Sequence, residues 1–492
     1  MIAALLHDRL LLDPERIALV DGVGGAGERA WSAGELDKVA LRWARVLAGR
    51  QRVGLIAENG LELAGVFLGA LYAGAAVVPF HVGTPPLEVQ DRMQRFGVDL
   101  LLSGNDALVA GYDAAVEGHG RPFGPSAGGP EREAPWADEP QAVDGDAPAL
   151  LLGTSGTTGE PRAVVVTHRG LAAHALALVA ATGLGPRDRV LASLPLAHSF
   201  GCRMALIVPL LAGACVVLTR RFSARRTLEV VRAQQVTWAP VVPTMLSAWA
   251  AVPVAEVPVP DTLRWVLAAD APLADALRVR AEARLGCEVR EGYGLTEASF
   301  STLDAPPGPR RPGTVGRPVP GVEVRLDPES HEVQLRGANV MAGYLDDAEA
   351  TRAAFSADGW LRTGDIGELD LAGNLRIVDR IKDIILRGGH TVYPAEVEAV
   401  LARHPSVLAV AVVGRAHAHL GEEVVAHVVL RPGQAAGGLE STLTAWSMQR
   451  LPAHKVPTEV VFQAELPLGP SGKVLKRRLR AGFGLPDEGS GR

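Results

Sequence analysis

The sequence predicts an α/β protein with a large N-terminal body and a smaller C-terminal module of α+β type. Helical and strand patterns alternate between residues 32 and 80, which is typical of a largely parallel sheet buried on both faces. After Asp379, short apolar segments alternate with helices, which indicates a separate small module. The 492 residues, 48% of them apolar, suffice for both parts and exclude disorder. We place the N-terminal domain at residues 1–381 and the C-terminal domain at residues 382–492.

The N-terminal body begins with a helix–strand–helix–strand series. Ser32 and Glu35 form a capping-box pair, and apolar residues at helical spacing follow them as far as Gly49. A strand is expected at residues 53–57. The uncharged run at residues 63–80 is long enough to span a membrane, but its glycines and its proline favour a buried helix to about residue 73 and a strand from residue 75 to residue 80. No membrane span is therefore expected.

The next elements lead to the small module. Residues 114–147 show no period and are expected to form a surface connection, and a buried strand follows at residues 148–152. In the small module the patterns predict two strands and two helices. They are strands at residues 407–413 and 423–430 and helices at residues 395–403 and 439–451, with a frayed tail from Pro486.

Charge and cysteine content narrow the class of protein. The formal net charge is -6 with a pI near 6.1, and no basic stripe lies outside the last twenty residues, so no footprint for a nucleic-acid binder is found. Three widely spaced cysteines, Cys202, Cys215 and Cys287, indicate neither disulfides nor a thiolate zinc site. Polar residues from His7 onward make the apolar start too short for a secretory signal. We expect a cytoplasmic protein, and the sequence leaves its oligomeric state open.

A hydroxyl-rich bend follows the strand at residues 148–152. Residues 153–162 read Gly-Thr-Ser-Gly-Thr-Thr-Gly-Glu-Pro-Arg, so that glycines expose backbone N–H groups among hydroxyls and one cation. Such a bend suits a polyphosphate, although it lacks the Walker spacing, and a plain linker is the alternative. The candidate phosphate ligands are Thr154, Ser155, Gly156, Thr157, Thr158, Gly159 and Arg162.

This bend resembles the phosphate-binding loop of the adenylate-forming superfamily, which contains acyl-CoA synthetases, amino-acid adenylation domains and luciferases. The resemblance extends along the whole chain. It implies the family's large body and mobile C-terminal lid, with ATP and magnesium as cofactors. The family loop usually ends in Pro-Lys, whereas this chain has Arg162, and lysine is rare among its 49 basic residues. A guanidinium still pairs with phosphate.

Residues 291–297, Glu-Gly-Tyr-Gly-Leu-Thr-Glu, combine an aromatic face for a purine, glycines for close approach, a hydroxyl and a carboxylate for a divalent ion. They resemble the family's adenylate-binding motif. The resemblance implies that Tyr293 and Gly294 contact adenine, Leu295 the acid, and Thr296 the α-phosphate, and that Glu297 binds magnesium. The alternative for Glu297 is an acid at a helix N-terminus.

Two upstream segments resemble those that surround the acyl pocket. Ala269, Asp270 and Ala271 stand where relatives line the adenine and acyl sites, and Asp270 either binds a polar group of the acid or is a turn residue. By resemblance, His198 lies near the reacting carboxylate and Phe200 lines the pocket. Phe200 stands about where amino-acid adenylation domains place an aspartate, so an α-amino acid is disfavoured.

Four segments near and beyond residue 360 complete the resemblance. Asp365 and Arg380 match the two ribose contacts, and Lys382 matches the hinge. Lys473 matches the lysine that reaches the carboxylate and the α-phosphate during adenylation, so we expect Lys473, Thr296 and His198 to be catalytic. The glycine pair, Gly388 and Gly389, resembles the segment that admits pantetheine in CoA ligases.

These features predict an ATP-dependent carboxylic acid–CoA ligase that forms an acyl-AMP and then a thioester from a fatty, aryl or other non-α-amino acid. The alternative is a stand-alone enzyme that loads an acid onto the phosphopantetheine of a carrier protein. An oxygenase of the luciferase type and a non-catalytic nucleotide-binding homologue are the other classes considered. A metal site at His417 and His419 is not expected.

Overall fold

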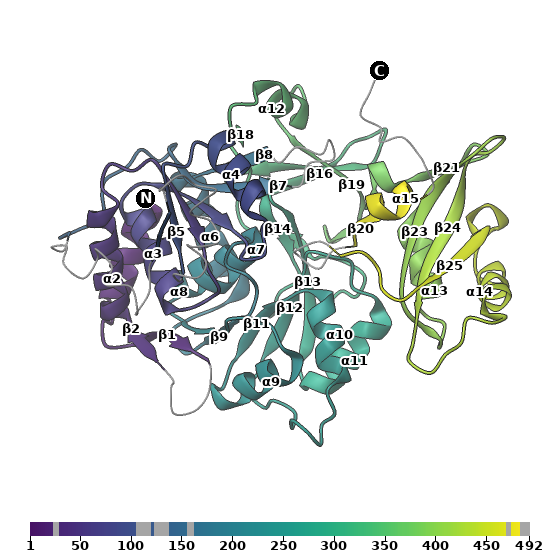
Figure 1. The fold of residues 1–492 in the computed structure, drawn as a ribbon, viewed down its shortest axis with the longest axis horizontal. Helices are drawn as coiled ribbons and strands as arrows, with labels where there is room; N and C mark the ends of the chain where they lie inside the picture. Colours follow the sequence, from purple (N-terminus) through teal and green to yellow (C-terminus); the bar gives the residue numbers. More distant parts are fainter. Residues whose placement is uncertain (23–28, 105–119, 123–136, 155–161, 469–473, 483–492) are drawn as a thin grey trace. The chain divides into compact units, whose positions relative to one another are not determined.

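The computed structural model describes residues 1–22, 29–104, 120–122, 137–154, 162–468 and 474–482. The chain forms two compact units. The first consists of Met1–Leu273, Leu277–Val324 and Leu335–Leu361, and the second of Ala274–Ala276, Arg325–Gln334 and Arg362–Arg492. The α/β body followed by a smaller α+β module is therefore as the sequence predicts (Figure 1).

A large sheet of the first unit comprises nine strands within the described residues. Their spatial order is β15 (Arg317–Pro318), β14 (Ser299–Leu303), β13 (Glu288–Leu295), β12 (Trp265–Ala268), β11 (Trp238–Val241), β9 (Arg189–Ala192), β10 (Cys215–Leu218), β1 (Ile17–Asp21) and β2 (Ala30–Ser32). The central pairs are parallel, and the pairs at both ends are antiparallel.

A second sheet of this unit has seven strands in the part of the chain that is described. Their order is β18 (Gly343–Tyr344), β8 (Arg162–Thr167), β7 (Pro148–Thr154), β4 (Ala76–Phe80), β3 (Arg52–Ile56), β5 (Leu100–Ser103) and β6 (Gly120–Pro122). The expectation that residues 114–147 form only a connection is wrong at β6, because these residues pair in parallel with β5. Strand β6 has only three residues and no alternation of apolar and polar side chains, so the sequence pattern could not predict its pairing with β5.

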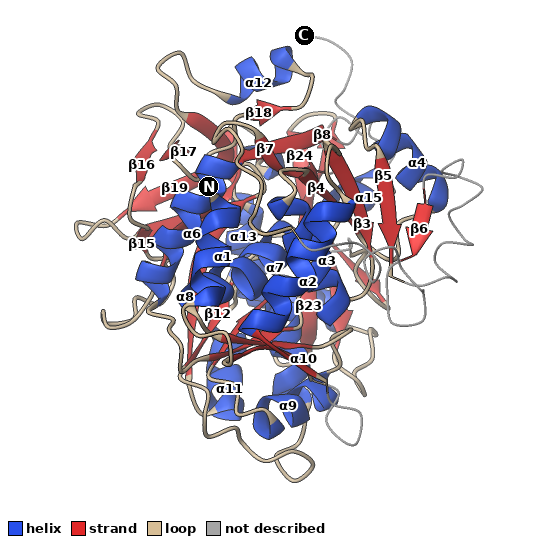
Figure 2. Ribbon diagram, turned by 90° about the vertical axis from the view of Figure 1, so that its left-hand side faces the viewer, coloured by secondary structure: helices blue, strands red, loops and turns tan. Residues whose placement is uncertain are grey.

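A layer of helices lies between these two sheets (Figure 2). It contains α1 (Ile2–Leu11), α2 (Ala33–Val46), α3 (Leu61–Tyr72), α6 (His168–Thr182) and α8 (Val208–Ala212). Helix α3 contacts β3 and β4 of one sheet and β1 of the other, so every residue of α3 except Glu62 is buried. This confirms the buried helix and strand predicted for residues 63–80. None of the described helices is long and apolar enough to cross a membrane.

The start of α2 and its packing follow from particular residues. Ser32 Oγ accepts the Glu35 N–H, and Glu35 Oε2 accepts the Ser32 N–H at 2.8 Å, which confirms the capping box. Helices α2 and α3 approach closely at Gly69, where a Cβ would lie 2.2 Å from Trp43 Cβ. A side chain at position 69 would therefore separate the two helices.

The outer faces of both sheets are covered as well. Val89, Met93 and Phe96, from α4 (Pro86–Arg95) and the residue after it, pack against alternate residues of β4, which include Val78 and Phe80. Figures 1 and 2 show α9 (Ala224–Ala233) and α10 (Pro243–Ala251) on the outer side of the nine-stranded sheet. The carboxyl ends of the buried strands then lead into the loops that carry the predicted site.

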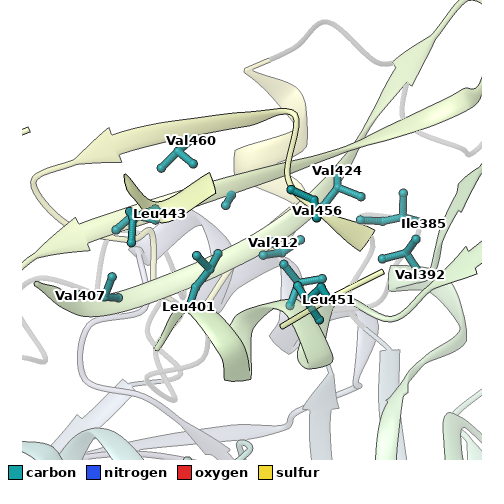
Figure 3. Packing of buried hydrophobic residues seen from close by; sticks show 13 residues of the cluster. Ile385, Val392, Leu401, Val407, Val412, Val424, Leu443, Leu451, Val456 and Val460 are labelled. Atoms are coloured by element: carbon teal, nitrogen blue, oxygen red, sulfur yellow. The ribbon is translucent and has the colours of Figure 1, made fainter. Parts of the chain in front are cut away.

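The second unit contains a mixed sheet and its own core. In the described residues the sheet comprises β22 (His390–Val392), β21 (Ile385–Arg387), β24 (Gly421–Leu430), β23 (Val407–His417) and β25 (Glu459–Gln463). Figure 3 shows the core, in which Leu401 of α13 (Pro394–Leu401) and Leu443 of α14 (Leu439–Met448) meet Val412 and Val424 of the sheet. The predicted helices and strands are thus present, and β23 extends further than the pattern indicated.

One further sheet and four further helices carry residues discussed below. Strands β16 (Val322–Leu326), β17 (Glu332–Gly337), β19 (Leu361–Leu369) and β20 (Leu375–Arg380) form a four-stranded sheet in that order. Helices α7 (Ser199–Cys202), α11 (Asp275–Leu285), α12 (Ala348–Ala354) and α15 (Lys476–Ala481) complete the set used below.

Candidate active site

The predicted phosphate-binding bend connects the two strands of a hairpin. Thr154 ends β7 and lies opposite Arg162, which begins β8, and Thr154 Oγ1 donates to the Arg162 carbonyl at 3.4 Å. The predicted ligands Ser155, Gly156, Thr157, Thr158 and Gly159 lie outside the described residues. The described ends of the bend therefore come together at the end of a buried strand, as the sequence suggested.

Arg162 is held in place but remains accessible. Its Nε lies 3.2 Å from Asp347 Oδ2, and its guanidinium carbon lies 5.5 Å from the centre of the Tyr344 ring. The Arg162 and Asp347 side chains are 34% and 37% exposed. Because Asp347 also caps α12 by accepting the Ala350 N–H at 2.8 Å, its carboxylate has a fixed position. Arg162 can thus present part of its fork to an anion while Asp347 orients it.

Tyr344 connects Arg162 to the predicted metal ligand. Its hydroxyl donates to Glu297 Oε1 at 3.0 Å, and burial, together with the Glu297 charge, raises the pKa of Tyr344 well above its usual range. Tyr344 lies on β18, which pairs with β8 next to Arg162, and the Met341 N–H donates to the Glu297 carbonyl at 2.7 Å. The structure therefore brings Arg162 and Glu297 together. No sequence pattern marked Tyr344.

The environment of Glu297 fits a magnesium ion that arrives with phosphate. Among the described residues, Tyr344 is the hydrogen-bond partner of its carboxylate, and no group of three or more histidine, cysteine or acidic side chains could hold a metal there. Magnesium in nucleotide sites is typically held by one or two carboxylates together with phosphates and water. A single oriented carboxylate matches that pattern.

The adenylate motif occupies β13 and the turn that follows it. Tyr293 is buried, 8% exposed, and lies opposite Thr302 of β14. A Cβ at Gly294 would lie 2.0 Å from the Ser299 carbonyl oxygen, so only glycine permits this close approach. Leu295 pairs with Ser299, and the three residues between β13 and β14, Thr296, Glu297 and Ala298, are thereby held in a tight reversal.

His198 and Asp270 lie near one another. Asp270 follows β12, just beyond the buried Ala269 and before the exposed Ala271, and has a left-handed φ of 76°. Its Oδ2 is 4.0 Å from His198 Nε2. His198 caps α7, and its Nδ1 accepts the Phe200 N–H at 3.3 Å, so the proton of the neutral ring is on Nε2 and faces Asp270. Asp270 is thus a strained turn residue and also a neighbour of His198.

Phe200 belongs to a buried aromatic pair beside these residues. Phe200 and Phe300 have ring centres 5.0 Å apart and planes tilted by 57°. His174 Nε2 lies 2.6 Å from the Phe300 carbonyl oxygen, and burial followed by the charge of Arg203 lowers the pKa of His174 to about 3. A neutral histidine therefore holds the strand that supports the pair.

In the second unit, the predicted ribose contacts are neighbours. Asp365 of β19 pairs in register with Arg380 of β20, and Arg380 Nε lies 3.0 Å from Asp365 Oδ1. Burial and the charge of Arg380 lower the pKa of Lys382, in the short helix Ile381–Asp383. Arg480 of α15 donates to Asp383 at 2.7 Å, which anchors the predicted hinge segment to the small module.

The glycine pair forms a two-residue hairpin turn between β21 and β22. Gly388 and Gly389 have φ values of 59° and 80°, and the flanking Arg387 and His390 are paired. Positive φ at both central positions defines the turn that matches strand twist. No described atom lies within 4 Å of a Cβ placed on Gly389, so φ rather than space requires glycine there.

Lys473 lies outside the described residues, but the ends of its loop are defined. Leu468 and Val474 form an antiparallel bridge, and the Leu475 N–H donates to the Pro467 carbonyl at 2.7 Å.

The backbone N–H groups of residues 419 and 420 donate to His417 Nδ1 at 3.2 Å. This histidine therefore orders its own turn.

Known proteins share this fold and domain organisation. Residues 7–345 match the family of AMP-binding enzymes, and residues 396–473 match the AMP-binding enzyme C-terminal domain. The chain is 35% identical to sulfoacetate–CoA ligase of Cupriavidus necator, with 97% of each covered. It is 32% identical to 4-coumarate–CoA ligase 5 of Oryza sativa subsp. japonica, with 97% of this chain and 94% of the relative covered.

A solved structure shows the same architecture. ATP-bound MatB from Rhodopseudomonas palustris has a TM-score of 0.89 at 29% identity, with 98% of this chain and 99% of MatB covered. The chain thus belongs to the family of AMP-binding enzymes. The prediction of an AMP-forming acid–CoA ligase of the adenylate-forming superfamily is confirmed by these relatives.

Proposed function

We propose that this chain converts ATP and a non-α-amino carboxylic acid into an acyl-AMP at a magnesium-dependent site, and then into an acyl-CoA. The observation that carries the proposal is the connection of Arg162 to Glu297 through Tyr344 at the end of the phosphate hairpin. A cation, an oriented carboxylate and a hydroxyl-rich bend are what a magnesium-bound triphosphate requires.

Each group at this site has a defined task. Glu297 holds magnesium, which supplies charge neutralisation on the phosphate oxygens. Arg162 and the bend with Thr154 bind the β- and γ-phosphates, while Thr296 contacts the α-phosphate. Tyr293 and Gly294 accommodate adenine. Since Tyr344 fixes the Glu297 carboxylate, the metal ligand is positioned before ATP arrives.

The reaction then proceeds in two balanced steps. A carboxylate oxygen of the acid attacks the α-phosphorus, the bond to the pyrophosphate oxygen breaks, and pyrophosphate leaves. In the second step the CoA thiolate attacks the acyl carbon, the carbon–oxygen bond to AMP breaks, and AMP leaves. Positioning and charge stabilisation carry both steps, without a protein nucleophile.

The second unit contributes groups to both steps. Asp365 and Arg380 bind ribose, and Lys473 offsets the charge of the acid and the α-phosphate in the first step. A rearrangement at Lys382, with domains at residues 1–381 and 382–492, then exchanges Lys473 for the turn at Gly388 and Gly389, which admits pantetheine. The anchoring of Asp383 by Arg480 supports Lys382 as the point at which the small domain begins.

The acid occupies the region of His198, Phe200, Asp270 and Leu295. The buried Phe200 provides no anion for an α-ammonium group, which supports a non-α-amino acid. CoA is proposed as the acceptor because the relatives are named as CoA ligases, of sulfoacetate and of coumarate. Three free cysteines suit a reducing compartment, and we place the enzyme in the cytoplasm.

Pyrophosphate release with a panel of carboxylic acids tests the proposal. Release that requires an acid, ATP and magnesium, and an acyl-CoA detected by mass spectrometry, are expected. A holo carrier protein replaces CoA in a parallel reaction, and a faster reaction with the carrier would contradict the proposed acceptor. Absence of acid-dependent release with every acid would contradict the ligase function and favour a nucleotide-binding role.

A further inference from the structure

Arg203 lies deep in the first unit, close in sequence to the predicted acyl site. It is the first residue of a π-helical segment, Arg203–Ile207, that continues α7. His198, the capping residue of α7, precedes it by less than two turns. Segments of this type are rare and are frequently found at functional sites. Arg203 is only 3% exposed.

Within the described part of the chain, the Arg203 side chain forms no hydrogen bond or ion pair, and its buried Nε lacks a partner. The other buried arginines are paired. Arg278 lies 2.7 Å from Glu282, Arg290 lies 2.7 Å from Glu288, and Arg284 donates to two backbone carbonyls at 2.7 and 2.8 Å. Arg284 Nη1 also lacks a partner, but of these four described arginines Arg203 is the one whose entire side chain has none. A buried charge without a partner is costly, so Arg203 requires an explanation.

Among the residues that the structure describes, none supplies a counter-charge to the Arg203 guanidinium. Burial lowers the pKa of Arg203 to about 10, so the guanidinium stays protonated at neutral pH. Burial raises the pKa of Cys202 to about 11, and the neighbouring thiol is therefore neutral. His174 is neutral as well, because its pKa is lowered to about 3. An anion would satisfy this environment.

The position of Arg203 indicates where such an anion comes from. Its charge acts on His174, whose Nε2 lies 2.6 Å from the Phe300 carbonyl oxygen. Phe300 packs against Phe200, the residue assigned to the acyl pocket. The π-helical segment also packs against β9 and β11. Arg203 thus lies in the buried interior of the body, three residues after Phe200 on the continuous helix that His198 caps.

We propose that Arg203 binds a second anionic group on the acid substrate, so that the preferred substrates are dicarboxylates or sulfocarboxylates. This inference rests on the ligase function proposed above. One carboxylate reacts near His198, while the distal carboxylate or sulfonate pairs with Arg203. A planar guanidinium can hold such a group through two parallel hydrogen bonds. A substrate with one anionic group leaves the buried guanidinium without a partner, and it therefore binds more weakly than a substrate with two.

Matched acids test the inference through pyrophosphate release by the full chain. The pairs are malonate with propanoate, succinate with butanoate, and glutarate with pentanoate, and sulfoacetate is a seventh probe. We expect a higher kcat/KM for the dianionic member of at least one pair. The ratio of the two values within that pair is then measured for Arg203→Met and Arg203→Lys. We expect Arg203→Met to lower the ratio by about 30-fold or more, and Arg203→Lys to retain part of the preference.

Arg284→Met is the control, since it also removes a buried guanidinium but one with backbone partners. It is expected to lower the melting temperature without changing the ratio. An unchanged ratio in folded Arg203→Met, or an equal change in Arg284→Met, would overturn the inference. If Arg203→Met does not fold, the wild-type comparison decides, because a preference for the monoanion in all three pairs also overturns it. Activity with monoanions alone leaves the ligase function intact, whereas no activity with any acid contradicts that function itself.

Discussion

Replacing Tyr344 with phenylalanine should raise the magnesium concentration that the enzyme requires. The change removes the hydroxyl that donates to Glu297 Oε1 at 3.0 Å but keeps the ring beside Arg162. A hydrogen bond to a charged group contributes about 1.5–3 kcal/mol when buried. Tyr344 is only half-buried, so we expect about 1–1.5 kcal/mol, which corresponds to about a tenfold weaker apparent affinity for magnesium.

The assay is acid-dependent ATP–pyrophosphate exchange at increasing magnesium concentration. Tyr72→Phe is the matched control, because the Tyr72 hydroxyl also donates to a carboxylate, Asp37 Oδ1, at 2.9 Å, but in the helix layer. Both variants should lose stability in urea unfolding, while only Tyr344→Phe should shift the magnesium midpoint. The same midpoint in wild type and Tyr344→Phe would refute the role of this hydroxyl in orienting Glu297.

Three further changes have distinct expected outcomes. Lys473→Ala should slow acyl-AMP formation by at least about 100-fold but spare thioester formation from supplied acyl-AMP. The control Lys476→Ala, which removes an ion pair with Glu398, should spare both half-reactions. Equal losses in the two half-reactions of Lys473→Ala would contradict the assignment. His174→Gln should remove part of the acid sensitivity of folding. The His174 pKa is about 3 in the folded protein and 6.5 in the reference state. Because the unfolded chain binds the proton more readily, the free energy of unfolding falls as the pH is lowered below 6.5, by about 2 kcal/mol at pH 5. An equal loss of unfolding free energy on acidification in wild type and variant would count against this. Gly389→Ala and the control Gly433→Ala both place a side chain at a left-handed φ, 80° and 84°, with no described atom within 4 Å of the new Cβ, and should each cost about 1 kcal/mol. Only Gly389→Ala should slow thioester formation, and equal rates in both variants would argue against a pantetheine path at this turn.

Local patterns sufficed for much of the fold. The capping box at Ser32 and the division of residues 63–80 into α3 and β4 depend on neighbouring residues, so periodicity and turn chemistry revealed them. Strand β6 was missed because its pairing with β5 leaves no apolar period in three residues. Local signals therefore predict elements better than they predict short pairings.

The candidate site shows the same division. The bend that ends at Arg162 and the acid Glu297 were found from their segments, whereas Tyr344 was not, because its role depends on β18 pairing with β8. The sequence likewise did not reveal that Arg203 is buried without a side-chain partner among the described residues, since that burial results from packing of the whole body. Neither the left-handed φ of Asp270 nor its distance of 4.0 Å to His198 could be read from the sequence, because both depend on the folded chain.

The fate of a carboxylate oxygen tests the proposed chemistry most directly. The acid is labelled with ¹⁸O in its carboxylate and incubated with ATP, magnesium and CoA, and the products are analysed by mass spectrometry. Attack of that oxygen on the α-phosphorus predicts one ¹⁸O atom in AMP and none in pyrophosphate. Label in inorganic phosphate, or unlabelled AMP beside a newly formed thioester, would show that the acid is not activated as an acyl-adenylate.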